Sequence, residues 1–194
     1  MVTKQAKKEF PELAHKTFLI GHSMGGTISI QTLVKAKADE FVGAVLSAPA
    51  VKVDPSQVTP ATLALVKLLG GVLPRLPVDK LNLSSLCNSK AVVDWYMNDP
   101  LIYNGRLCAR LANELLQQCN IMLVDSAPKI NLPFLLVHGT EDHICNLSGS
   151  EEFFERVTQV KDKTFTKLQG AMHESLHEKP EHIDVVVKWV ASRL

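Results

Sequence analysis

The pentapeptide Gly21-His-Ser-Met-Gly25 constrains this chain most, because it joins a strand-like segment to a helix-like one. Residues 17–21 form the short apolar run of a buried strand, and residues 24–37 have helical spacing. G-x-S-x-G in this context indicates a nucleophile elbow, a strained turn that lifts a serine hydroxyl clear of the sheet. A side chain at either flanking glycine is expected to collide with backbone there. We therefore interpret Ser23 as a nucleophile rather than as an incidental serine in a glycine-rich loop.

Alternating strand-like and helix-like segments predict a parallel sheet covered by helices on both faces. Strands are expected at residues 17–21, 41–46, 134–139 and 163–168. Helices are expected at residues 24–37, 148–158 and 180–192, with the end of a further helix in residues 3–15 before a turn at Pro11. The sequence thus predicts one α/β domain over residues 1–194.

Residues 50–128 differ from the rest of the chain. Their helix-like pieces, separated by Gly70-Gly71, Pro74 and Pro77, are expected at residues 59–69, 89–98 and 105–121. We expect no strand in this region. It therefore interrupts the alternation between the second and third strands as a helical insertion.

A catalytic acid and a catalytic base are expected later in the chain, in the order serine, acid, histidine. The acid should follow a late strand, and the histidine should follow the next one. Asp142 follows the strand at residues 134–139 and is favoured over its competitors Glu141 and Asp125. His173 follows the next strand and is the predicted base. His22, beside the candidate nucleophile, is expected to brace the elbow, and His138 lies inside a strand.

His173-Glu-Ser-Leu-His177 also matches H-E-x-x-H, a zinc-binding signature. That motif needs a continuous helix and a third ligand. Here the segment follows a strand through Gly170, and Pro180 would break a helix that ran through it. We therefore expect no metal site and no cofactor.

Composition excludes several function classes. The formal net charge of +1 and the lack of a basic run argue against a nucleic-acid partner. The charged first ten residues do not form a secretory signal, and no window reaches the roughly 18 apolar residues of a spanning helix. The four cysteines show no C-x-x-C spacing, which favours free thiols in a reducing compartment. We expect a cytoplasmic protein that contacts membrane surfaces peripherally.

Several stretches together resemble the monoacylglycerol lipase family of α/β-hydrolases. The resemblance runs from about residue 5 to the C-terminus, and its motifs are residues 18–26, 45–49, 99–102, 133–139 with Asp142, and 170–178. Gly-His-Ser-Met-Gly-Gly is shared by many lysophospholipase-like relatives, so it marks the superfamily. The segment Gly-Ala-Met-His-Glu-Ser-Leu-His-Glu and the insertion before Asp99-Pro-Leu are more selective.

The resemblance implies a serine esterase that cleaves monoacylglycerol or lysolipid esters to a free fatty acid. Ser23 would be the nucleophile, His173 the base and Asp142 the residue that orients it, with the Met24 N–H as an oxyanion donor. The resemblance also implies that Tyr96 and Cys145 contact substrate, and that residues 50–128 form a cap over an acyl tunnel.

Family members carry further N-terminal strands and a His-Gly loop that completes the oxyanion hole, and this sequence lacks both. The resemblance therefore implies a partial α/β-hydrolase domain in which the strand at residues 17–21 has an open edge. The alternative function is that of a catalytically impaired remnant that binds a lipid or a partner protein.

Overall fold

The structure is a computed structural model that describes residues 2–13, 16–37, 40–54, 59–79 and 82–194. Its central sheet has the strand order β1-β2-β5-β6, and all neighbouring strands are parallel. The strands are β1 (Phe18–His22), β2 (Gly43–Ser47), β5 (Phe134–Gly139) and β6 (Lys163–Leu168). The predicted parallel α/β architecture is confirmed, and the last two strands have their predicted bounds.

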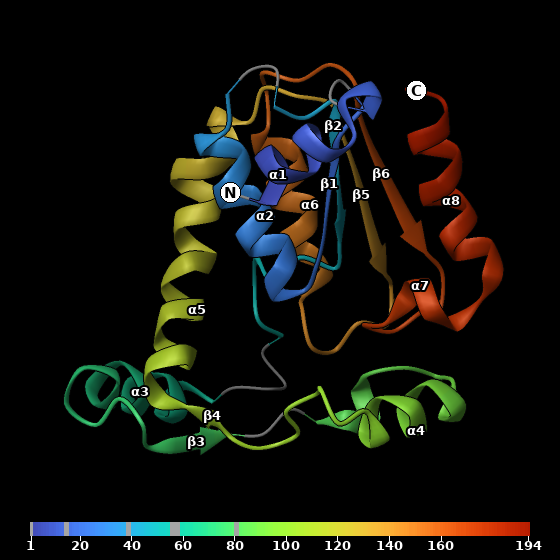
Figure 1. Cartoon of the computed structure of the whole chain (residues 1–194). Helices are drawn as coiled ribbons and strands as arrows, with labels where there is room; N and C mark the ends of the chain where they lie inside the picture. The colour runs from blue at the N-terminus through green and yellow to red at the C-terminus, as the bar shows by residue number, and fades with distance from the viewer. Residues whose placement is uncertain (1, 14–15, 38–39, 55–58, 80–81) are drawn as a thin grey trace.

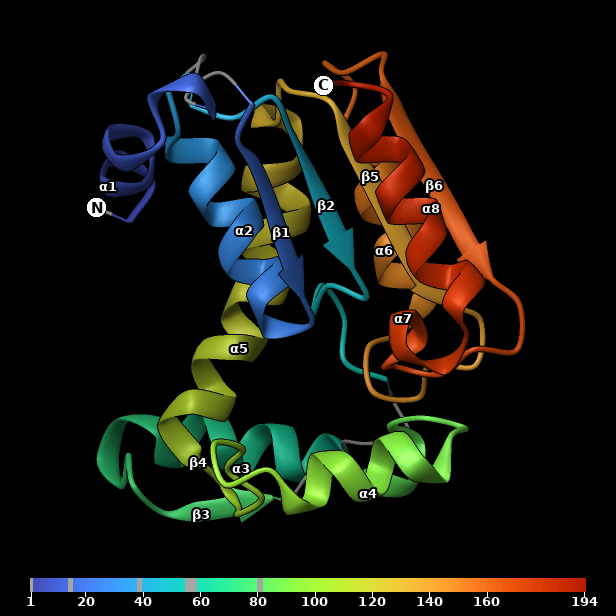
Figure 2. The same cartoon turned by 45° about the vertical axis from the view of Figure 1, so that its right-hand side comes forward.

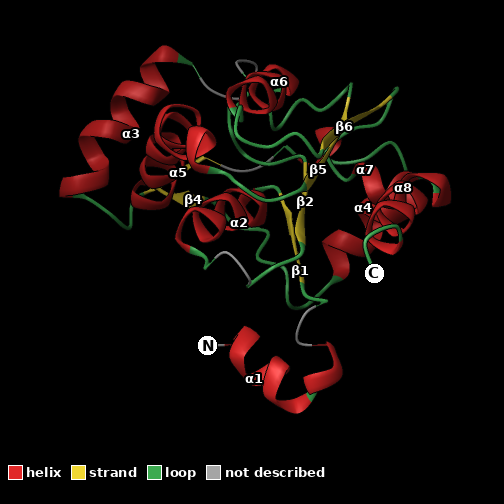
Figure 3. Ribbon diagram, turned by 90° about the horizontal axis from the view of Figure 1, so that it is seen from above, coloured by secondary structure: helices red, strands yellow, loops and turns green. Residues whose placement is uncertain are grey.

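Helices cover both faces of this sheet, as Figure 3 shows from above. One face packs against α2 (Met24–Lys35) and α6 (Leu147–Arg156), and the other against α8 (Pro180–Ala191). Strand β5 is buried along its whole length because its side chains alternate between the two cores. Phe134 and Leu136 pack with Ile30 and Phe153, whereas Leu135 and Val137 pack with Val186 and Trp189.

The N-terminal helix is shorter than the sequence pattern indicated. Helix α1 spans Val2–Glu9, and a single 3-10 turn at Pro11–Leu13 follows it. Residues 14 and 15 of the expected element lie outside the described residues. The break at Phe10 agrees with the predicted turn at Pro11, since a residue before proline avoids helical geometry.

Part of the segment between β2 and β5 forms a second layer across the carboxyl ends of the strands, and its last α-helix runs back from that layer alongside α2 (Figures 1 and 2). We refer to its described residues, 59–79 and 82–126, as the insertion. Its helices are α3 (Pro60–Val72), α4 (Lys90–Asn98) and α5 (Ala109–Ile121), with a 3-10 turn at Leu83–Ser85. A π-helical turn at Met122–Ser126 and a 3-10 turn at Ala127–Lys129 return the chain to the sheet.

Two expectations for the insertion were wrong. Strands β3 (Pro77–Asp79) and β4 (Leu107–Cys108) form a small antiparallel pair where no strand was expected. Strands this short show no periodicity in sequence. Helix α3 also continues through Gly70-Gly71 instead of ending there. A Cβ on Gly70 would come within 2.9 Å of Asn113 Cβ on α5, so this glycine permits the close approach of the two helices.

Strand β1 is an edge strand of the sheet that the described residues form. Ile20 on this strand is 58% exposed, and Ile28 on the neighbouring helix α2 is 56% exposed. The parallel arrangement brings the ends of β1, β5 and β6 to one side of the molecule, facing the layer that contains α3 and α4 (Figure 2). The residues singled out by the sequence follow these three strand ends.

Candidate active site

Ser23 occupies a strained turn between β1 and α2. Its φ of 53° and ψ of −121° lie in a region that non-glycine residues rarely adopt. The Ser23 N–H donates to Ser47 O (3.0 Å), and its carbonyl accepts from the N–H groups of Gly26 (3.0 Å) and Ala50 (3.1 Å). These bonds tie the turn to the loop after β2. Strain of this kind persists only where the surroundings hold it, and it concentrates at functional sites.

The glycines around Ser23 have different roles. A Cβ on Gly21 would collide with Ser29 Oγ and with the carbonyl of Gly25, whose carbon would lie 2.7 Å away. A Cβ on Gly25 would meet nothing within 4 Å, so the expectation of a collision at both flanking positions was wrong for this one. Instead Gly26 is crowded, since its Cβ would lie 2.7 Å from Pro49 Cβ. The turn needs glycine where α2 passes close to β1 and to the loop after β2.

Asp142 and His173 form a buried pair at the ends of β5 and β6. His173 Nδ1 lies 2.8 Å from Asp142 Oδ2, and both residues are at most 5% exposed. Asp142 Oδ1 accepts the backbone N–H groups of Ile144 (2.8 Å) and Cys145 (3.0 Å). Burial alone would raise the pKa of Asp142, but hydrogen bonds from His138 and His173 outweigh it and hold the pKa well below its usual range. Asp142 therefore stays ionised and fixes the orientation of the His173 ring.

The two carboxylates that were considered as alternatives to Asp142 are both exposed. Glu141 is exposed and points toward His143 at 3.9 Å, and Asp125 is an exposed residue of the π-helical turn. The His173 ring packs 4.8 Å from the ring of His22, the residue before Ser23. The fold thus brings Asp142 and His173 together and places His173 against His22, the residue before Ser23, from strand ends that lie far apart in sequence.

A second carboxylate joins two further histidines. Glu174 Oε1 lies 3.1 Å from His22 Nε2, and Glu174 Oε2 lies 2.9 Å from His177 Nδ1. Burial would raise the pKa of Glu174, but the hydrogen bond from His22 leads the groups that lower it to about 2. His22 Nδ1 also lies 3.3 Å from Ser47 Oγ. Glu174 therefore ties the strand that carries the elbow to the loop that carries His173.

The residues of the H-E-x-x-H match do not share a helix. His173 precedes α7 (Ser175–Glu178), which is only four residues long, and α8 starts anew at Pro180. His173 and His177 bind two different carboxylates through their Nδ1 atoms. In the described part of the chain, no three His, Cys, Asp or Glu side chains are grouped to hold a metal ion.

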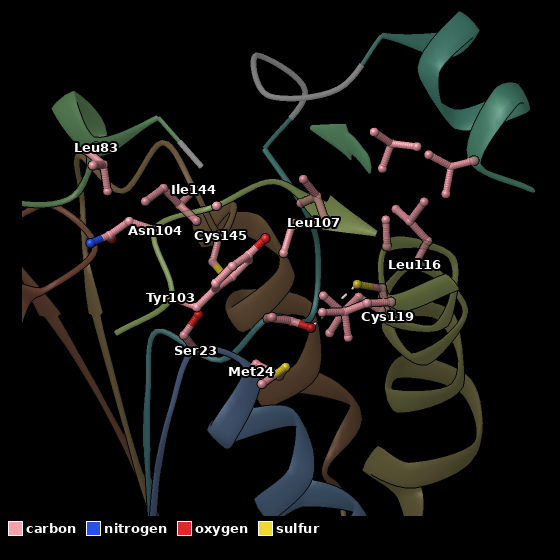
Figure 4. Close-up of a pocket in the computed structure, with 18 of the residues that line it drawn as sticks. Ser23, Met24, Leu83, Tyr103, Asn104, Leu107, Leu116, Cys119, Ile144 and Cys145 are labelled. Carbon is pink, nitrogen blue, oxygen red and sulfur yellow. Dashed lines mark hydrogen bonds between the residues drawn. The ribbon is translucent and has the colours of Figure 1, made fainter. Parts of the chain in front are cut away.

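A cavity of about 340 Å³ opens above Ser23 (Figure 4). Its wall is largely apolar and comes from the elbow, the insertion and the loop after β5. Apolar lining residues include Val66, Leu107, Leu111, Leu115, Leu116 and Ile144. Met24, Tyr96 and Cys145 also line it, whereas Asp142 and His173 are buried outside its lining. The volume and the apolar wall of the cavity suit a hydrocarbon chain whose polar end lies at Ser23.

The two thiols that line the cavity are poorly ionised. Burial raises the pKa of the Cys119 thiol to about 11. Burial, followed by the negative charge of Asp142, raises the pKa of Cys145 still further. A thiol nucleophile in this cavity is therefore disfavoured at neutral pH, which leaves the Ser23 hydroxyl as the candidate nucleophile.

Three residues of the site were missed by sequence reasoning. His138 was set aside because it lies inside a strand, yet its Nε2 lies 3.0 Å from Asp142 Oδ2. Glu174 was considered only as part of the zinc motif. Glu178 accepts the N–H groups of Met172 (2.9 Å) and Asn88 (3.1 Å), and so joins the His173 loop to the insertion. In the sequence, Glu174 and Glu178 are marked only as members of the family-like motif at residues 170–178, and His138 by its place near the end of a strand.

Comparison with known proteins gives a consistent set of relatives. Residues 1–180 match the family described as "Serine aminopeptidase, S33". The monoglyceride lipase of Mus musculus is 34% identical over 97% of this chain and 62% of its own length. A crystal structure of a Paleococcus ferrophilus monoacylglycerol lipase superimposes with a TM-score of 0.84 at 31% identity, over 100% of this chain and 75% of that one.

A soluble variant of monoglyceride lipase from Saccharomyces cerevisiae, solved with a substrate analogue, has the same fold. Its TM-score is 0.81 at 23% identity, over 99% of this chain and 68% of that one. The alignment with the mouse monoglyceride lipase covers 97% of this chain, which therefore spans 62% of the length of that relative.

Proposed function

Because the chain belongs to the serine aminopeptidase S33 family of α/β-hydrolases, we propose that it hydrolyses the carboxylic esters of monoacylglycerols or lysolipids, releasing a free fatty acid. The strained Ser23 elbow at the mouth of an apolar cavity, with the buried His173–Asp142 pair beside it, is the observation that carries this proposal. The monoglyceride lipases among its relatives point to the same substrate class.

Each residue has a defined role in the proposed reaction. Ser23 Oγ attacks the ester carbonyl, and His173 Nε2 takes the hydroxyl proton and later returns it to the departing alcohol. His173 can do this because its other nitrogen, Nδ1, is held by Asp142. Met24 begins α2, so no intrahelical carbonyl accepts its N–H, which is free to stabilise the oxyanion. Water then hydrolyses the acyl-serine ester with His173 again as base.

The cavity supports a lipid ester as substrate. Its apolar wall would hold the acyl chain, while Tyr96 and Cys145 would lie along the bound molecule. The insertion would act as a cap, since α3, α4 and α5 contribute side chains to this wall. Apart from the substrate and the attacking water, the proposed steps use side chains and backbone groups of this chain.

The function is tested by measuring fatty acid release from a long-chain monoacylglycerol. Ser23→Ala and His173→Ala are each expected to lower kcat by on the order of 10⁴–10⁶-fold, because residues of a triad act as a unit. Ser192→Ala, which removes an exposed hydroxyl at the end of α8, is the matched control and should be neutral. Near-normal turnover by Ser23→Ala would refute the proposal. Tight fatty acid binding without turnover by the unchanged chain would favour a lipid-binding protein.

Peripheral contact with a membrane is part of the same proposal. In the described residues, no helix is both long and apolar enough to cross a bilayer. The insertion nevertheless exposes large apolar side chains, namely Leu68 (69%), Val72 (74%), Trp95 (59%) and Leu101 (92%). Large apolar side chains exposed to this extent are costly in water and would be stabilised against lipid.

Vesicle co-sedimentation tests this contact. The double variant Leu68→Glu, Val72→Glu should lose binding to phosphatidylcholine vesicles while fatty acid release from a dispersed short-chain ester persists. Val187→Glu, on the similarly exposed surface of α8, is the matched control. Equal loss in both variants would contradict a contact through the insertion.

A further inference from the structure

His138 is a buried histidine to which the proposed reaction steps assign no role. It is 0% exposed within β5, four residues before Asp142. Its Nε2 lies 3.0 Å from Asp142 Oδ2 and 3.0 Å from the backbone oxygen of Cys145. Its Nδ1 lies 2.8 Å from the hydroxyl of Ser150, which is also fully buried. A polar ring buried among apolar side chains is retained only where its hydrogen bonds are satisfied.

The partners of His138 determine where its proton lies. Nε2 faces two oxygens that only accept hydrogen bonds, a carboxylate and a carbonyl, so Nε2 must carry a hydrogen. In the neutral ring, Nδ1 is then an acceptor, and the Ser150 hydroxyl can donate to it. The two acceptors at Nε2 therefore select the tautomer that donates toward Asp142, and the Ser150 hydroxyl satisfies the other ring nitrogen.

With this donor, the carboxylate of Asp142 is fully bonded. Oδ1 accepts the N–H groups of Ile144 and Cys145, and Oδ2 accepts from His173 and faces the single Nε2–H of His138, which it shares with the Cys145 carbonyl. Two carboxylate oxygens offer about four acceptor positions, and all four are used here. The carboxylate is thus held in one orientation. His138 also donates to the Cys145 carbonyl in the loop after β5.

We propose that His138 is a positioning residue for the Asp142–His173 pair, held in its Nε2–H tautomer by the oxygens of Asp142 and Cys145, with Ser150 as the donor to Nδ1. It draws charge from Oδ2, which weakens that oxygen as an acceptor for His173, and it prevents the carboxylate from rotating away. This inference rests on the proposed function, because it concerns how readily His173 accepts a proton.

Kinetics of His138→Leu and His138→Gln test the proposal. His138→Leu removes the donor and should lower kcat by about 10–100-fold, the effect of one lost hydrogen bond to a charged group. It should also raise the apparent pKa of the acidic limb of kcat/KM by roughly 0.5 or more, since Oδ2 then binds the His173 imidazolium more strongly. Gln can donate from its side-chain amide and should restore both quantities toward the parent values.

His182→Leu is the matched control, because His182 also has a ring nitrogen bonded to a backbone oxygen, Ser175 O at 2.6 Å, away from Asp142. It should leave the acidic limb unchanged. The inference would be overturned if His138→Leu left the apparent pKa of the acidic limb of kcat/KM unchanged. It would also be overturned if His138→Gln did not restore kcat, since His138 would then only fill space.

A spectroscopic measurement on the unmodified chain gives an answer even if a variant fails to fold. The ¹⁵N shifts of the His138 ring should show a protonated Nε2 and an unprotonated Nδ1 at neutral pH, and the opposite tautomer would overturn the inference. Failure of the proposed function is distinguishable, since it would appear as no turnover by the unchanged chain or as full activity in Ser23→Ala, and neither result changes the ring spectrum of His138.

Discussion

The two glycines that flank Ser23 should respond oppositely to alanine. At Gly21 the added Cβ would lie 2.7 Å from the carbonyl carbon of Gly25 and closer still to its oxygen, well inside the roughly 3.5–4.0 Å of a normal carbon contact. These are backbone atoms of α2, so relief requires the helix to shift. Overpacking of this kind costs about 1–3 kcal/mol, a substantial part of a net stability of about 5–15 kcal/mol.

At Gly25 the same Cβ has open space. Because Gly25 lies in α2, alanine there should stabilise the fold by up to about 1 kcal/mol through helix propensity. Thermal unfolding followed by circular dichroism measures both changes. Since 1 kcal/mol corresponds to about 2–4 °C in a protein of this size, Gly21→Ala should lower Tm by roughly 2–12 °C, and Gly25→Ala should leave Tm equal or slightly higher. Equal destabilisation by both variants would refute the steric argument.

Two further predictions concern ionisable groups. The pKa of Glu174, lowered from 4.5 to about 2, adds stability that is fully present above pH 4.5 and is lost as the pH falls toward 2. Glu174→Gln should therefore be less stable than the parent at pH 7, by at most about 3 kcal/mol, and denaturant titrations should show this gap closing toward pH 3; a constant gap would contradict the assignment. The raised pKa of Cys145 predicts slow reaction with a maleimide at pH 7, and its place in the cavity predicts that the adduct blocks turnover. Cys145→Ala should stay active and lose this sensitivity, and unchanged sensitivity would exclude Cys145 as the target.

The sheet was predictable because its strands are short apolar runs between turn residues. The bounds of β5 and β6 followed from the sequence, since each run begins and ends abruptly. The end of helix α3 and the presence of strands β3 and β4 were not predicted from the sequence, because they depend on contacts between segments. The close approach of Gly70 to Asn113 keeps α3 continuous, and the pairing of Pro77 with Cys108 creates a strand pair.

The site was predictable to the extent that chain order and strand ends specify it. Asp142 and His173, predicted in this way, form a buried pair, and Ser23 lies in the strained turn predicted for it, while their catalytic roles stay a prediction. The residues that support them were not predicted, because their role lies in contacts that a linear pattern does not record. His22 and Glu174 bond across 152 positions of sequence. His138 is only four residues from Asp142, but the turn that brings them together is fixed by the fold.

Active-site labelling tests the central claim most directly. A fluorophosphonate reacts with a serine only where a base activates it and a cavity admits the probe. After labelling, digestion and mass spectrometry, the phosphonate should be found on the peptide that contains Ser23. Labelling should be lost in Ser23→Ala and strongly slowed in His173→Ala, whereas Ser192→Ala should label normally. A chain that folds cooperatively yet takes up no probe, or takes it up at another serine, would contradict the account.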